Sequence, residues 1–69
     1  GLVVRYDQAE VGAIDRAWRG ALESEGFAVV EDTSRGDLVS CSLARGEDGV
    51  ALAISAIRGG VVVSLQELP

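Results

Sequence analysis

The sequence predicts an α+β fold: one helix packed on one face of an antiparallel meander sheet of four strands, or of five if residues 2–6 join an edge. A helical period of apolar residues, a helix-stop signal at Gly26 and an alternating pattern after it support this prediction. The expected order is β-α-β-β-β-β. The 69 residues make a single small domain, and a chain this short buries only about 60% of its unfolded surface.

The N-terminal part predicts a strand and then a helix. Residues 2–6 alternate between apolar and other positions, as a short strand does. Asp7 is expected to cap the helix, with Glu10 three residues later completing a capping box. The helical stripe expected to face the core consists of Val11, Ile14, Trp18, Ala21 and Leu22, with Ala17 beside it.

The helix end is the best-defined local signal. Gly26 suits the left-handed position that follows a helix, which makes Leu22 and Phe27 the apolar pair of a Schellman motif. The chain should therefore reverse at Gly26 into the next strand. Asp15 and Arg19 lie four residues apart in the order that favours a helical ion pair.

Beyond Gly26 the apolar period is two, and strands are expected at residues 27–32, 37–44, 50–57 and 61–67. Short connections that contain glycine divide them, which is typical of hairpins in an antiparallel meander. One side of these strands is expected to form the core with the helix: Phe27, Val29, Val39, Cys41, Leu43, Val50, Leu52, Ile54, Val61, Val63 and Leu65.

The other side of the predicted sheet is small, nearly uncharged and partly apolar. A solvated strand face usually carries charged or long polar side chains. Either water tolerates this face, or a second copy, a partner or another part of the same protein covers it. The candidate interaction residues are Ser40, Ser42, Ala51, Ala53, Ser55 and Ser64.

Composition excludes several classes of function. The net charge is -5, from 11 acidic and 6 basic residues, which disfavours nucleic acid and anionic membranes as partners. There is no His and a single Cys, so most metal sites and nucleophile–base pairs are missing. No apolar run is long enough to cross a bilayer. We expect no enzyme activity, no catalytic residues, no cofactor, no metal and no membrane insertion by this segment.

The remaining motifs have plain structural interpretations. Arg35-Gly36-Asp37 matches the integrin-recognition tripeptide, but it falls at a predicted turn, where glycine and polar neighbours are ordinary. The acidic pairs at 31–32 and 47–48 are expected to be solvated hairpin tips. Cys41 and Trp18 fall at core positions, as a small hydrophobe and a helix anchor.

Three segments within about residues 6–65 resemble a small domain of uncharacterised bacterial envelope lipoproteins and secreted proteins. Ala21-Leu22-Glu23 with Gly26-Phe27-Ala28-Val29 is similar to the helix end of that domain. Residues 49–54 and 60–65 are similar to its strands. The resemblance implies an envelope or secreted location and a role without catalysis.

Three functions remain open. The leading hypothesis is a non-catalytic protein-interaction or structural module that binds another protein, or a second copy of itself, through the small-residue face or a sheet edge. The first alternative is a small-ligand-binding module with a pocket between helix and sheet. The second is an acidic regulator or inhibitor of a basic partner.

Overall fold

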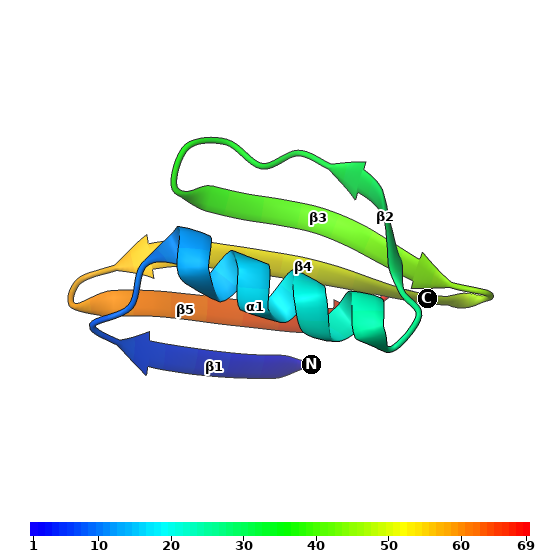
Figure 1. Ribbon diagram of the computed structural model, residues 1–69, viewed down its shortest axis with the longest axis horizontal. Helices are drawn as coiled ribbons and strands as arrows, with labels where there is room; N and C mark the ends of the chain where they lie inside the picture. The colour runs from blue at the N-terminus through cyan, green and yellow to red at the C-terminus, as the bar shows by residue number, and fades with distance from the viewer.

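The computed structural model describes residues 1–69 and shows one helix lying across one face of a five-stranded sheet (Figure 1). All neighbouring strands are antiparallel, in the order β1-β5-β4-β3-β2. The predicted fold class is confirmed, and the N-terminal strand does join an edge. The elements are β1 (Leu2–Asp7), α1 (Val11–Ser24), β2 (Ala28–Asp32), β3 (Leu38–Arg45), β4 (Asp48–Ile57) and β5 (Gly60–Glu67).

The core lies between α1 and the three central strands. The predicted alternation is confirmed there, because every fully buried residue belongs to the expected core side: Val39, Cys41, Leu43, Val50, Leu52, Ile54, Val61 and Val63. Val11, Ile14, Trp18 and Leu22 pack against this cluster from the helix. Ala21 does not, and is exposed, since it lies about 100° around the helix from Leu22.

The predicted helix cap at Asp7 is wrong. Asp7 is the last residue of β1 and pairs with Gly60, and the next main-chain N–H, that of Gln8, donates to the Gly59 carbonyl at 2.8 Å. Gln8 then turns the chain with a φ of +55°, and the helix begins at Val11 without a side-chain cap. Strand pairing has therefore overridden the local capping signal.

The predicted helix end is confirmed. Gly26 has a φ of +94°, which favours glycine. The Phe27 N–H donates to the Leu22 carbonyl and the Gly26 N–H to the Glu23 carbonyl, both at 3.0 Å, which is the Schellman pattern. At 14 residues α1 has neither the length nor the apolar character that crossing a membrane requires.

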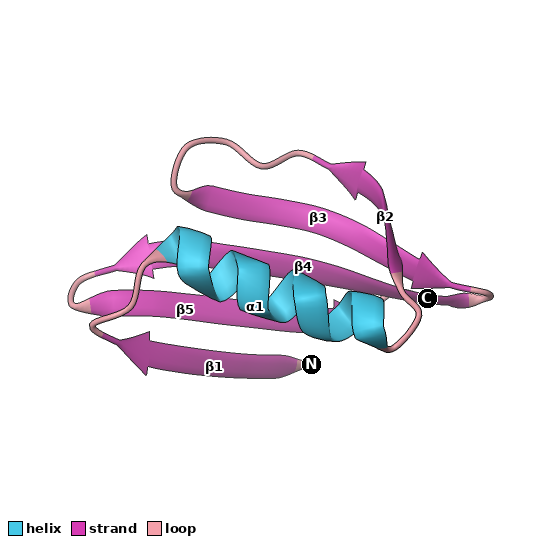
Figure 2. Cartoon of the chain, viewed as in Figure 1, coloured by secondary structure: helices cyan, strands magenta, loops and turns pink.

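All three predicted hairpins form, with strand ends displaced by one or two residues (Figure 2). Gly36 and Gly46 have φ values of +58° and +60° at the first turn positions, as tight hairpin turns of the II′ kind require. Gly59 has a φ of +83° in the turn between β4 and β5.

A bulge in β2 overturns part of the predicted alternation. Val29 pairs with Leu43, but the next pair is Glu31 with Ser42, so Val30 is the extra residue. Val29 lies on the core side but is 40% exposed at the sheet edge. Beyond the bulge, Asp32 pairs with Cys41 and so faces the helix, while Glu31 faces away from it.

Candidate interaction face

The side of the sheet away from α1, here called the open face, has no other part of the chain over it (Figure 2). Its centre is a row across three strands, because Ala53 pairs with Ser40 on one side and with Ser64 on the other. Ser42 pairs with Ala51 in the next row, and Ser55 stands in the row on the other side. The structure therefore brings together all the candidate interaction residues that alternation predicts.

The middle of the open face carries small side chains, and its polar side chains make no hydrogen bonds within the chain. Ala53 is exposed, and the five other candidate residues are half-buried by their neighbours in the sheet. None of the side-chain hydrogen bonds within the chain uses the hydroxyl of Ser40, Ser42, Ser55 or Ser64. These hydroxyls are free to bond water or a docking partner.

The rim of the open face is apolar with few charges. Val3, beside Ser64 in the register, is 70% exposed, and Leu38, beside Ser55, is 48% exposed. Arg5 forms an ion pair with Asp7 at 3.5 Å on the β1 side, and Glu31 stands on the β2 side. The open face is therefore weakly charged at its rim as well as at its centre, and its most exposed apolar side chains stand at the rim.

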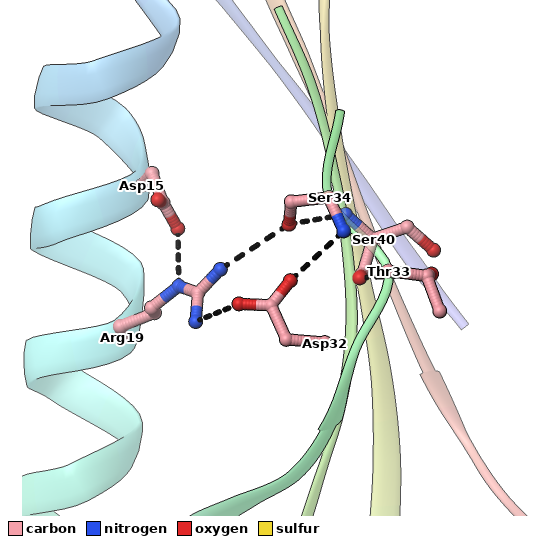
Figure 3. A network of polar contacts seen from close by, with 6 residues as sticks. All are labelled: Asp15, Arg19, Asp32, Thr33, Ser34 and Ser40. Atoms are coloured by element: carbon pink, nitrogen blue, oxygen red, sulfur yellow. Dashed lines mark hydrogen bonds and ion pairs between the residues drawn. The ribbon is translucent and has the colours of Figure 1, made fainter. Parts of the chain in front are cut away.

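The helix side carries a polar network that the sequence indicates only in part (Figure 3). The expected pair forms, with Arg19 Nε at 2.6 Å from an Asp15 carboxylate oxygen. The same guanidinium also lies 3.0 Å from Asp32, which the bulge has turned toward the helix. Asp32 is exposed beside the β2–β3 turn, as predicted, but it also forms an ion pair with the helix that its place in an acidic pair did not indicate.

Ser34 connects this network to the sheet (Figure 3). Its N–H donates to Asp32 Oδ1 at 2.9 Å, and its hydroxyl accepts the N–H of Ser40 at 3.1 Å. Hydrogen bonds from the hydroxyl and the N–H of Ser34, together with Arg19, lower the pKa of Asp32 to about 2. The hydrogen bond to Asp15 is the main reason why the pKa of Arg19 is raised. The network fastens the edge strand β2 to α1.

The lowered pKa of Asp32 predicts a pH-dependent stability. A carboxyl whose pKa falls from 3.8 to about 2 on folding stabilises the folded chain above pH 4 and loses that contribution as the pH drops toward 2. Asp32→Asn should therefore unfold more easily than the wild type near neutral pH, with a difference that shrinks between pH 4 and pH 2. Urea unfolding followed by circular dichroism across that range measures it.

The control for this prediction is the neighbouring carboxylate. Glu31 faces away from Arg19, so Glu31→Gln should follow the wild type at every pH. An Asp32→Asn deficit that stays constant down to pH 2 would contradict an electrostatic role for Asp32.

Cys41, the Arg35-Gly36-Asp37 tripeptide and the acidic pair at residues 47–48 have positions that structural roles explain. Cys41 is buried, and burial raises the pKa of its thiol, which disfavours the reactive thiolate. Arg35, Gly36 and Asp37 lie at the exposed β2–β3 turn, where Arg35 and Leu38 exchange main-chain hydrogen bonds. Asp48 lies 3.6 Å from Arg45 across the β3–β4 turn. No group of three or more His, Cys, Asp or Glu side chains is arranged to hold a metal ion.

Hollows in the surface lie at the ends of the sheet. One lies beside the start of α1, against Ala56 and Val61, and another lies at the corner formed by Leu2, Val50 and Leu65. A third is bordered by Phe27, Arg45 and residues near the C-terminus. None of these three is lined by the central helix residues Ile14, Trp18 or Leu22, and the first lies between the sheet and the start of α1 only.

Comparisons of the chain with protein-family models, with curated proteins and with solved structures find no match.

Proposed function

We propose that the protein is a non-catalytic interaction module that binds another protein, or a second copy of itself, through the open face. The observation that carries the proposal is that a five-stranded sheet has one helix on one side and nothing on the other. The uncovered side presents Ala and Ser side chains that let another layer approach closely. The resemblance in the helix end and strands adds an envelope or secreted location to the proposal.

The chemistry of the open face favours a flat, weakly charged partner surface. A layer seated on Ala53 would release water from the surrounding methyl and methylene groups, at about 25 cal/mol per Å² of apolar area. The free serine hydroxyls would add adaptable hydrogen bonds. The -5 net charge resides mostly outside this face, so it would influence the approach of a partner more than the contact itself.

One charged substitution at the centre of the open face tests the proposal. Ala53→Arg should abolish binding through the open face, because it places a long cation in the middle of that contact. Ala17→Arg is the matched control, since Ala17 is also exposed but lies on the helix. The measurements are solution mass over a dilution series and capture of proteins from an extract of the source cells, with each variant beside the wild type.

Support requires self-association, or a captured protein, that the wild type and Ala17→Arg share and Ala53→Arg lacks. The proposal fails if Ala53→Arg keeps every association of the wild type. It also fails if the wild type neither self-associates nor captures anything that Ala53→Arg does not.

A further inference from the structure

The two edges of the sheet differ in how they are protected. The β2 edge is short, broken by the bulge at Val30, acidic at Glu31 and tied to the helix through Asp32. Bulges and inward-facing charges are devices that keep an edge from pairing with another chain. The β1 edge has no bulge and no charge facing the helix, because its six residues pair with β5 in one uninterrupted register and its two charged residues, Arg5 and Asp7, lie on the open face and pair with each other.

The main chain of β1 offers a defined set of unpaired groups. The Gln8 N–H donates to Gly59, so position 8 is a hydrogen-bonded pair of the β1–β5 ladder. Bonded and non-bonded pairs alternate in an antiparallel ladder. The N–H and C=O groups of Leu2, Val4 and Tyr6 therefore point to β5, and those of Val3, Arg5 and Asp7 point outward from the sheet.

Two apolar side chains of β1 are exposed, and pairing with another strand would cover them. Leu2 is 49% exposed on the helix side of the sheet, and Val3 is 70% exposed on the open face. Both lie on an edge strand with no neighbour beyond it (Figure 1). An added strand would cover each of them.

We propose that the β1 edge pairs with β1 of a second copy, antiparallel and about a two-fold axis at Val4, so that the two sheets become one continuous sheet. Each Val3 N–H then donates to the Arg5 carbonyl of the other copy, and each Arg5 N–H to the other Val3 carbonyl. On the helix side, Val4 meets Val4 and Leu2 meets Tyr6, which joins the two apolar cores.

The charges of β1 select this register. Moving the axis to Arg5 would place two guanidinium groups directly opposite each other, which is destabilising. Moving it to Tyr6 would match Arg5 with Asp7 but leave Leu2 and Val3 unpaired. With the axis at Val4, the exposed apolar residues are covered, and each Arg5 retains its own Asp7 at 3.5 Å. The two open faces then lie on the same side of the dimer, available for any other partner.

Amide hydrogen exchange across a dilution series tests the pairing without any substitution. In submillimolar protein the Val3 and Arg5 amides should exchange at about one tenth, or less, of the rate that they have in low-micromolar protein. Hydrogen bonding to the second copy protects them at the higher concentration. The Asp7 amide also points outward and faces Gly1 of the other copy in this register, so it should be protected too. The Glu47 amide lies in the exposed β3–β4 turn, away from this edge, so its exchange should not change. Exchange of the Val3 and Arg5 amides that does not depend on concentration would overturn the proposal.

A proline at Val3 tests the same edge by mutation. The Val3 N–H takes no part in the β1–β5 ladder, so Val3→Pro leaves the fold intact and blocks only the outer edge. Sedimentation should show the dimer dissociation constant raised by about tenfold or more, because each copy loses a main-chain hydrogen bond. Val3→Thr keeps the N–H and the branched shape and should dimerise like the wild type.

The variant Ala53→Arg distinguishes dimerisation through the β1 edge from dimerisation through the open face. This variant should dimerise normally if the dimer forms through β1, whatever the open face binds. A dimer lost in Ala53→Arg and kept in Val3→Pro would overturn the edge proposal and support self-association through the open face. A wild type that remains monomeric at submillimolar concentration would overturn the edge proposal alone.

Discussion

Ile54→Ala should lower the free energy of unfolding by about 2–5 kcal/mol, the usual cost of truncating a large aliphatic side chain in a core. Ile54 is completely buried at the centre of β4, between Val39 and Val63 in the register. Small domains have only about 5–15 kcal/mol of stability. This variant should therefore be partly unfolded at moderate temperature, as urea or thermal unfolding would show.

Graded controls separate packing from general disturbance of the strand. Ile54→Val should cost about 0.5–1.5 kcal/mol, because only one methylene group is lost. Val30→Ala, at the exposed bulge, should change stability by about 0.5 kcal/mol or less. Equal costs for Ile54→Ala and Val30→Ala would contradict the assignment of the core to the helix side of the sheet.

Gly60→Ala should destabilise the protein by about 1–3 kcal/mol through a backbone collision. A Cβ at Gly60 would overlap the main-chain carbonyl oxygen of Tyr6, which the edge strand cannot move without breaking its pairing. The damage should concentrate in β1, since β5 is the only neighbour of that strand. Thermal unfolding gives the total loss, and amide exchange shows whether the even-numbered amides of β1 lose protection first.

Gly20→Ala is the matched control for this change. A Cβ at Gly20 meets nothing within 4 Å, and the residue lies inside α1. Alanine should stabilise the helix there by about 0.5–1 kcal/mol. The same substitution is thus expected to act in opposite directions at the two positions. Destabilisation at both would indicate that the close β1–β5 approach is not what makes Gly60 necessary.

Local signals of the sequence were sufficient for much of the fold. The Schellman ending at Gly26 and the glycine turns are decided by main-chain conformation, which neighbouring residues determine. Strict alternation after residue 37 identifies both sides of β3, β4 and β5. For the same reason the residues of the open face could be named in advance, although the role of that face could not.

Features that depend on distant residues could not be predicted in the same way. The bulge at Val30 turns Asp32 toward Arg19, and only the assembled sheet and helix place those two side chains together. Asp7 carries a good capping signal, but its pairing with Gly60 takes precedence. The local sequence of β1 does not show that this strand pairs with β5. It therefore does not show that the outer edge of β1 is the unprotected edge of the sheet.

The central claim is that the open face is the contact surface, and amide NMR tests it most directly. Spectra of the labelled Val3→Pro chain, in which pairing through β1 is blocked, are compared with and without association, whether by dilution or by adding a captured partner. The account predicts shifts at Ser40, Ala53 and Ser64, with Ala17 and the rest of the outer helix surface unchanged. Shifts confined to the helix surface, with the open face unaffected, would contradict it.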